Sequence, residues 1–367
     1  MENVEKNMQI EKLREMIDTV DNRLIQLLNE RFELAVKIGR LKEHIYDEKR
    51  EEIVLKHVRE LCGNLLIGEE FCVEMYQKII AQSRKLQEED IKLIGFQGEH
   101  GAYSEIAGLK FARIINAEKF TTLPFKSFEE VIQNVESGIL DYGVLPVQNS
   151  LEGPINSATY ALLESDLNVV AEVTLPINHC LLILPESDPK EIKFVYSHPQ
   201  ALVQCRNFLK RLSLQPVEFF DTAGAARKLS TECITNAAAI ASSLAAKIYG
   251  LEILKDNIQD YSHNRTSFWI LSKHMNKNGS KCAVTFLLED RPGALLTVLE
   301  LFKVREINLT RIISLPSRNQ PNKYRFFVDF QTRNVENIEE FLDVLQDHTK
   351  ELRLLGLYDS FEIDDEV

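Results

Sequence analysis

Proline and glycine are absent from much of the N-terminal sequence: no proline occurs before Pro124 and no glycine before Gly39. Because both residues interrupt helices, this excludes the commonest breaks from a long helix at the start of the chain. No apolar run approaches the roughly 20 residues that cross a bilayer. The polar start MENVEKNMQIEKL lacks the apolar core of a signal peptide. We therefore expect a cytoplasmic location and no membrane partner.

A surplus of positive charge is also missing. The chain has 43 Lys and Arg against 56 Asp and Glu, a formal net charge of −13, so phosphates repel it and no nucleic-acid partner is expected. With 44% hydrophobic and 27% charged residues, the composition excludes a disordered chain, a collagen-like repeat and a disulfide scaffold. The 367 residues are enough for two or three domains.

No close pair of cysteines stands at metal-site spacing, and no metal is expected. The six cysteines are scattered, which is typical of small buried residues in a reducing compartment. They are Cys62, Cys72, Cys180, Cys205, Cys233 and Cys282.

Residues 1–90 are expected to form an all-α domain of three helices. Apolar residues recur at three- and four-residue steps from Ile10 to Leu41, which is the period of a helix. This helix has about 35 residues and is roughly 50 Å long at 1.5 Å per residue. A small monomer cannot cover it, so we expect it to pack against a second chain. The second helix is expected from about Asp47 to Leu61 and the third from about Glu69 to Leu86.

Several polar side chains of these helices could line one cavity. Arg31 and Lys42 are about three turns apart and share a face, whereas Arg14 lies about 100° around the helix from Arg31 and could serve a partner's site. Judged singly, such charges more often belong to a solvated face. The candidates on the second and third helices are Asp47, Arg50, Glu51, Ser83 and Gln87.

Taken together, these residues and the segments EKLREMIDTVDNRLIQLLNER, FELAVKIGRLK and SRKLQ resemble the all-helical chorismate mutases. The resemblance implies an intertwined dimer in which Arg14 reaches into the partner's site. Chorismate rearranges to prephenate by an intramolecular Claisen shift, which needs only a held conformer and stabilised charge on the ether oxygen. The arginines suit the substrate carboxylates. Lys42 and Gln87 are the implied ether-oxygen donors, and Asp47 and Glu51 would orient the ring hydroxyl.

Residues 91–273 alternate short apolar runs with helical stretches. This predicts an α/β domain with mainly parallel sheets and two subdomains, with the first crossover near Val173 to Asn178. The corner GFQGEHGAYSEIAG lacks the Gly-Lys-Ser/Thr ending of a phosphate loop, but its helix N-terminus could hold a carboxylate. Judged alone, His198 fits a turn residue and Thr266 a strand residue.

The same block resembles prephenate dehydratase, in this corner and in VLPVQNSLEGPIN, LPINHCLL, DTAGAA and NRTSF. The resemblance implies two subdomains like those of periplasmic binding proteins, with substrate in the cleft. Prephenate loses CO₂ and its ring hydroxyl to give phenylpyruvate, so a donor must assist the leaving hydroxyl and no cofactor is needed. The resemblance assigns that role to Thr266, lines the cleft with Asn149, Ser150 and Gly153, and places Ser104 at the glycine-rich corner.

Two positions depart from the dehydratase pattern. The family usually has arginine after the catalytic threonine, where this chain has Ser267, and glutamate where it has Gln148. Loss of the arginine removes a potential carboxylate anchor or a structural ion pair. The expected consequence concerns substrate affinity more than the type of reaction.

Residues 281–367 follow a polar linker, His274 to Lys281, and have the order β-α-β-β-α-β of a ferredoxin-like α+β domain. RPGALLTVLELF and KYRFFVDF resemble an ACT regulatory domain, which implies phenylalanine binding between two such domains. The family's Glu-Ser-Arg-Pro is here Ile-Ser-Leu-Pro, so weaker inhibition is expected; a bare dimerisation module is the alternative. The implied regulatory contacts are Gly293, Ala294, Leu295 and Ser314.

The three resemblances together imply a bifunctional, cofactor-free enzyme of phenylalanine biosynthesis. Its partners would be chorismate, prephenate, phenylalanine as allosteric effector, and further copies of the chain in a homodimer or higher homo-oligomer. An arogenate-preferring dehydratase with mutase activity is one alternative, and a non-catalytic aromatic-amino-acid sensor is another. The complete mutase constellation and Thr266 argue against the sensor.

Overall fold

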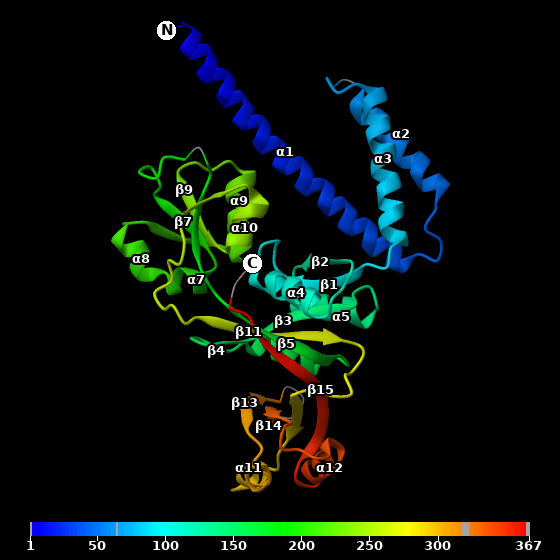
Figure 1. The fold of residues 1–367 in the computed structure, drawn as a ribbon, viewed down its shortest axis with the longest axis vertical. Helices are drawn as coiled ribbons and strands as arrows, with labels where there is room; N and C mark the ends of the chain where they lie inside the picture. The colour runs from blue at the N-terminus through cyan, green and yellow to red at the C-terminus, as the bar shows by residue number, and fades with distance from the viewer. Residues whose placement is uncertain (1, 64, 186, 318–322, 365–367) are drawn as a thin grey trace. The chain divides into compact units, whose positions relative to one another are not determined.

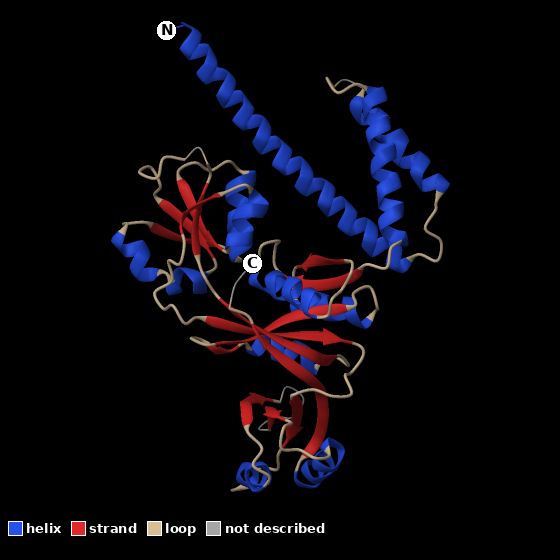
Figure 2. Cartoon of the chain, viewed as in Figure 1, coloured by secondary structure: helices blue, strands red, loops and turns tan. Residues whose placement is uncertain are grey.

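The computed structural model describes residues 2–63, 65–185, 187–317 and 323–364. It divides into two compact units, Met1–Lys92 with Lys119–Thr121, and Leu93–Glu118 with Thr122–Val367. We call them the helical unit and the α/β unit, which Figure 1 colours in chain order and Figure 2 by secondary structure. In the described part of the chain, no helix is long and apolar enough to cross a membrane.

The helical unit contains the expected three helices, α1 (Glu2–Leu41), α2 (Glu48–Cys62) and α3 (Glu69–Glu88). Asp47 caps the N-terminus of α2, because its side chain accepts a hydrogen bond from the backbone of Arg50. Most of α1 leaves its apolar side chains exposed in one chain, which supports the expectation of a second chain along this helix. These exposed residues are Met8, Ile10, Leu13, Met16, Ile17, Val20, Leu24, Ile25, Leu27, Leu34, Ile38 and Leu41.

The expectation that no cysteines pair is wrong for one pair. Cys62 at the end of α2 and Cys72 in α3 form a disulfide, with Cα atoms 6.7 Å apart, because the two helices lie against each other where they are joined. Cys233 is exposed, not buried. The disulfide weakens the cysteine argument for a reducing compartment, so a cytoplasmic location stays a prediction. The cysteines that are free and buried, as expected, are Cys180, Cys205 and Cys282.

The first sheet of the α/β unit has the strand order β15-β5-β11-β3-β1-β2, with the two-residue β4 beside β3. Strands β1 and β3 are parallel, but β11 returns antiparallel between β3 and β5. Strands β1, β3 and β5 therefore run in one direction, as the expectation of mainly parallel sheets requires, and β11 is a reversed strand that the sequence did not predict. The elements are β1 (Lys92–Gln97), α4 (Tyr103–Ile114), β2 (Phe120–Phe125), α5 (Phe128–Glu136), β3 (Tyr142–Asn149), β4 (Gly153–Pro154), α6 (Asn156–Leu163), β5 (Asn168–Pro176) and β11 (Arg265–Ser272).

The second sheet has the order β10-β6-β9-β7-β8. The chain leaves the first sheet after Pro176 and enters the second at Cys180, so the two-sheet arrangement and the predicted crossover near Val173 to Asn178 are confirmed. Small residues dominate its centre, where β9 is fully buried between helices. Its elements are β6 (Cys180–Ile183), β7 (Phe194–Ser197), α7 (Pro199–Gln204), α8 (Arg206–Arg211), β8 (Gln215–Glu218), α9 (Thr222–Thr231), β9 (Ala237–Ala241), α10 (Ser243–Tyr249) and β10 (Glu252–Lys255).

The C-terminal block has the predicted β-α-β-β-α-β order and the sheet order β13-β14-β12-β15. The second half of β15 continues onto β5 as a parallel neighbour, so this block is joined to the first sheet (Figure 2). Gly356 makes the crossing possible, since a Cβ there would lie 2.1 Å from the Val169 carbonyl oxygen. The elements are β12 (Lys281–Leu287), α11 (Ala294–Val304), β13 (Leu309–Pro316), β14 (Tyr324–Gln331), α12 (Ile338–His348) and β15 (Lys350–Glu362).

Candidate active sites

Three of the predicted mutase residues meet between α1 and α3. Arg31 Nη1 donates to Ser83 Oγ at 2.8 Å, and Gln87 Nε2 donates to the Ala35 carbonyl oxygen at 2.8 Å. Gly39 permits this approach, because a Cβ there would lie 2.7 Å from Gln87 Cγ. The lack of a side chain at Gly39 therefore lets Gln87 lie against α1.

A second group lies where α1 leads into α2. Lys42 Nζ is 3.9 Å from Asp47 Oδ2, and Asp47 Oδ1 accepts from the Arg50 backbone at 3.0 Å. Glu51 faces Arg84 of α3, at 3.5 Å, and this arginine was not among the predicted residues. Its place in SRKLQ, directly after Ser83, was the available signal.

Arg14 stands apart from the other mutase candidates. It is exposed and pairs with Glu11 of its own helix at 2.7 Å. Arg31 is 17 residues further along the same helix, which is about 25 Å. A single unbroken helix cannot bring Arg14 to the cavity of its own chain.

The predicted dehydratase acid lies at the start of β11, opposite the end of β3. Thr266 and Asn149 are register partners, and Asn149 Nδ2 donates to Thr266 Oγ1 at 2.9 Å. Both side chains are buried. Among the described residues, the Thr266 hydroxyl donates no hydrogen bond, so its proton remains available for a substrate.

The neighbouring predicted residues shape the corner after β3. Asn149 Oδ1 accepts from the backbone amides of Leu151 at 3.0 Å and Glu152 at 3.1 Å. Ser150 Oγ donates to the His263 carbonyl oxygen at 3.1 Å and so ties the corner to the segment before β11. Gly153 has φ +84°, a left-handed conformation that favours glycine.

A buried chain of amides and an imidazole, absent from the sequence prediction, links the two sheets at Thr266. Asn264 receives a bond from Asn149 at 2.7 Å and donates to Gln204 Oε1 at 3.0 Å. Because an amide oxygen only accepts, His179 Nε2 donates to the same Gln204 oxygen, at 2.9 Å. Burial lowers the pKa of His179, so the ring is neutral at pH 7. NRTSF contains Asn264 and LPINHCLL contains His179, which was the signal for these two residues, whereas Gln204 lies in neither segment.

The glycine-rich corner before α4 is held by a carboxylate. Glu105 accepts from His100 Nδ1 at 2.7 Å, from the Gly101 amide at 2.5 Å and from Thr122 Oγ1 at 2.7 Å. Burial alone would raise the pKa of Glu105, but these donors outweigh it and lower the pKa, so the group is ionised. Ser104 lies beside it in the first turn of α4, which has no side-chain cap and so presents backbone N–H groups.

Two family models match the chain. The model of chorismate mutase type II matches residues 13–88, and that of prephenate dehydratase matches residues 94–276. A bifunctional chorismate mutase/prephenate dehydratase of Aquifex aeolicus is 36% identical over 365 residues, with 95% of this chain and 98% of that protein covered. The chain belongs to the bifunctional chorismate mutase/prephenate dehydratase family. Within the described residues, no cluster of side chains could hold a metal ion.

Other relatives of this family member cover its α/β unit. Arogenate dehydratase/prephenate dehydratase 1 of Arabidopsis thaliana is 40% identical over 284 residues, covering 72% of this chain and 71% of that protein. The solved prephenate dehydratase of Arthrobacter aurescens in complex with L-Phe is 27% identical, with a TM-score of 0.65 over 73% of this chain and 89% of that one. GqqA, described as a quorum-quenching acylase, is 32% identical, with a TM-score of 0.66 over 74% of this chain and 98% of that one.

The two residues that depart from the dehydratase pattern lie next to each other in the sheet of this family member. Ser267 and Gln148 are register partners, on the face of the sheet opposite Thr266 and Asn149. Ser267 Oγ is 2.9 Å from Thr174 Oγ1, and Gln148 Oε1 accepts from Arg311 of the C-terminal block at 2.9 Å. This geometry favours a structural pair over a substrate anchor at position 267.

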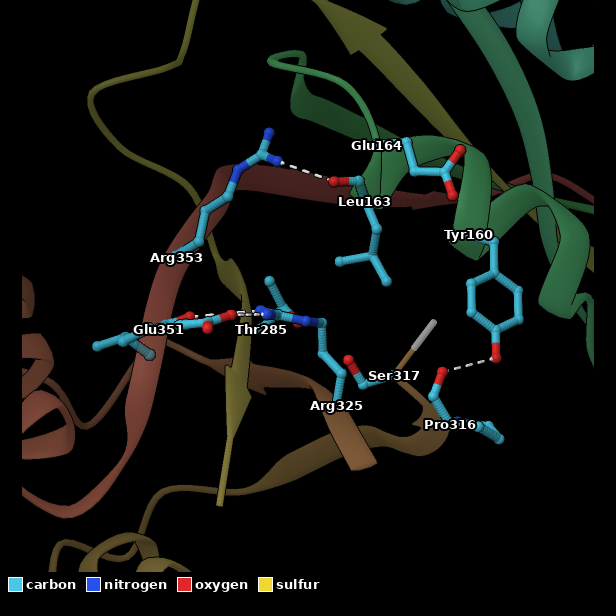
Figure 3. Close-up of a pocket in the computed structure, with 10 residues that line it drawn as sticks. Tyr160, Leu163, Glu164, Thr285, Pro316, Ser317, Arg325, Glu351 and Arg353 are labelled. Atoms are coloured by element: carbon cyan, nitrogen blue, oxygen red, sulfur yellow. Dashed lines mark hydrogen bonds and ion pairs between the residues drawn. The ribbon is translucent and has the colours of Figure 1, made fainter. Parts of the chain in front are cut away.

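The C-terminal block borders a cavity of about 480 Å³ against α6 (Figure 3). Arg325 pairs with Glu351 on its sheet side, and Tyr160 donates to the Pro316 carbonyl oxygen at 3.1 Å. The lining residues are Tyr160, Leu163, Glu164, Thr285, Pro316, Ser317, Arg325, Glu351, Leu352 and Arg353.

The predicted phenylalanine contacts do not line this cavity. Gly293, with φ +82°, directly precedes α11, which packs on the opposite face of the C-terminal sheet from Thr285. Ser314 is exposed on β13. The sequence-predicted effector residues and the cavity are therefore separate candidate sites.

Proposed function

We propose that the helical unit converts chorismate to prephenate and the α/β unit converts prephenate to phenylpyruvate, through the residues described above. The observation that carries the second assignment is the Asn149–Thr266 hydrogen bond, in which the threonine oxygen accepts and its proton stays free. For the first, it is the set of cations and donors around the junction of α1, α2 and α3.

The mutase site has to hold chorismate in its folded conformer and to stabilise the negative charge on the ether oxygen. Arg31 and Arg50 bind the two carboxylates of chorismate and hold the folded conformer. Lys42 and Gln87 donate to the ether oxygen, which gains negative charge as its bond breaks. Arg14 comes from a second copy of the chain in an intertwined dimer, in line with its distance from Arg31 and the exposed apolar face of α1.

In the dehydratase site, Thr266 gives its proton to the ring hydroxyl as the C–O bond breaks, and water leaves. The electron pair of the bond to the ring carboxylate enters the ring, and CO₂ leaves. Asn149 Nδ2 donates to the threonine oxygen and stabilises the charge left on it until solvent restores the proton. The first turn of α4, with Ser104, holds the remaining carboxylate.

The C-terminal block is an ACT domain with the ferredoxin-like layout, and its ligand is phenylalanine. Gly293, Ala294, Leu295 and Ser314 would contact this effector at an interface between two copies. The relative from Arthrobacter aurescens, whose structure contains L-Phe, supports the choice of ligand. Inhibition is expected to be weak, because Ile313 and Leu315 replace the charged residues of the family motif.

Arogenate is the second candidate substrate of the dehydratase. It carries an amino group where prephenate has a keto group, and the Arabidopsis relative is named for both substrates. The test is a comparison of kcat/KM of the purified chain on chorismate, prephenate and arogenate. We expect turnover of chorismate and a higher value for prephenate than for arogenate. A higher value for arogenate would reassign the substrate, and no turnover of any of the three would favour the amino-acid sensor.

A further inference from the structure

Arg311 joins the C-terminal block to the catalytic sheet. It lies on β13, and its side chain is only 7% exposed. Nη2 donates to Glu172 of β5 at 2.5 Å, Nη1 pairs with Asp329 of β14, and Nε donates to Gln148 of β3 at 2.9 Å. The guanidinium also lies over the ring of Trp269, 5.2 Å from its centroid. One side chain therefore contacts four strands.

The charges around Arg311 fix its position. Lys281 Nζ donates to the second oxygen of Glu172 at 2.5 Å, so two cations face two buried carboxylates. Burial alone would raise the pKa of Glu172, but Arg311 and Lys281 lower it, so this carboxylate is ionised. A shift of the guanidinium would leave the buried, ionised Glu172 without one of its two cations, so few alternative arrangements are open to Arg311. The guanidinium is thus a fixed point for the third contact, to Gln148.

Gln148 stands directly before the residue that holds the proposed acid. Side chains alternate along β3, so Gln148 faces Arg311 while Asn149 faces Thr266. The backbone at this point is flanked by the short β4 and by the register shift between Ser267 and Phe268 in β11. A rotation of the strand end about its axis would carry Asn149 Nδ2 away from Thr266 Oγ1. The bond from Arg311 opposes that rotation from the other face.

We propose that Arg311 is a positioning residue of the dehydratase, contributed by the C-terminal block, and that it acts through Gln148 on the Asn149–Thr266 pair. The role assigned to Thr266 rests on the proposed function, and the experiment below separates the two. On this face of β3, the Gln148 side chain accepts its hydrogen bond from Arg311.

The decisive variant is Gln148→Met, which removes the acceptor and leaves Arg311 its two carboxylates. We expect the dehydratase kcat to fall about ten-fold with prephenate KM within two-fold, because a small misplacement of a catalytic group is felt in the chemical step. Gln148→Glu keeps an acceptor for the same N–H and should stay within two-fold of wild type. Ser267→Ala, at the same register and on the same face, is the matched control and should also stay within two-fold.

Arg311→Lys supplies a second measure, since an ammonium cannot reach three acceptors in a fixed plane. It should lower kcat as Gln148→Met does, and the double variant should lower it no further. Wild-type kcat in Gln148→Met, equal losses in Gln148→Met and Gln148→Glu, or multiplying losses in the double variant would each overturn the proposal. If Thr266→Ala itself keeps full activity, the acid assignment fails, and the Gln148 series is then judged on its own kcat values.

Discussion

A threonine can serve as an acid only when its oxygen is prepared for the charge it will carry. In this chain Thr266 is buried and receives a hydrogen bond from Asn149, which in turn is held by two backbone amides of the next corner. The amide therefore stands ready for the developing alkoxide, without reorganisation during the reaction. This pair carries the dehydratase assignment at the scale of single residues.

Thr266→Ala should lower the dehydratase kcat by about 10²–10⁴-fold, the usual contribution of a positioned acid. The same preparation should keep its chorismate mutase activity, because Thr266 lies in the α/β unit. Phenylpyruvate formation and chorismate consumption, measured on one sample, provide the test and its control. Near-normal phenylpyruvate formation would exclude Thr266 as the acid.

Lys42→Ala should have the opposite effect. Removal of one donor to a developing oxyanion costs about 3–4 kcal/mol, or roughly 10²–10³ in mutase rate. Prephenate turnover should not change. Lys56→Ala, an exposed lysine of α2 outside the proposed site, is the matched control. Mutase turnover within a few-fold of wild type in Lys42→Ala would show that Lys42 is not the ether-oxygen donor.

Glu105 makes the corner before α4 sensitive to acid. Its pKa is lowered in the folded chain, so its interactions stabilise the fold above the unfolded pKa and are lost as pH falls through the folded value. Urea unfolding of wild type and Glu105→Gln should therefore differ most near pH 7 and converge in acid. A gap that stays constant down to pH 3 would contradict this source of stability.

At the scale of elements, α1 shows what a sequence pattern can and cannot provide. Its apolar spacing predicted a long unbroken helix, and the structure confirms Glu2–Leu41. The resemblance supplied the mutase residues, and Arg31, Ser83 and Gln87 do lie between α1 and α3. A local pattern identifies such elements because the helix period is expressed within a few turns.

Pairings between strands that are far apart in sequence could not be predicted from such local patterns. Arg311 and Gln148 are 163 residues apart in sequence and meet only because β15 continues the C-terminal sheet onto β5. The antiparallel return of β11 was missed for the same reason, since strand direction depends on the whole sheet. The Cys62–Cys72 disulfide required knowledge of how α2 and α3 lie against each other.

The long α1 leads to a prediction about assembly. If Arg14 serves the partner's site, a mixture of Arg14→Ala and Arg31→Ala chains should recover mutase activity after subunit exchange. Each mixed dimer then has one site with both defects and one with neither. Fluorescence transfer between labelled chains can confirm that exchange occurred. If subunits exchange and mutase activity does not recover, each site is built from one chain.

At the scale of the whole molecule, the C-terminal block cannot be cut away to locate the effector. Truncation before β12 would remove β15 from β5, expose that strand as a sheet edge, and take away Arg311 and Lys281, the cations that contact Glu172. Loss of phenylalanine binding in such a chain would therefore not separate loss of the effector site from loss of fold. Point variants that each delete one hydroxyl avoid this difficulty.

Ser314→Ala and Thr285→Val are such a pair, one at the predicted effector contact and one in the cavity of Figure 3. Loss of one hydrogen bond of about 1 kcal/mol should raise the Kd for phenylalanine about five-fold in Ser314→Ala. Thr285→Val should bind as wild type does, in calorimetric titrations of the full chain. The reverse result would move the effector into the cavity against α6. No heat of binding in the wild type would leave the C-terminal block as a support for the dehydratase, in which Arg311 still holds β3.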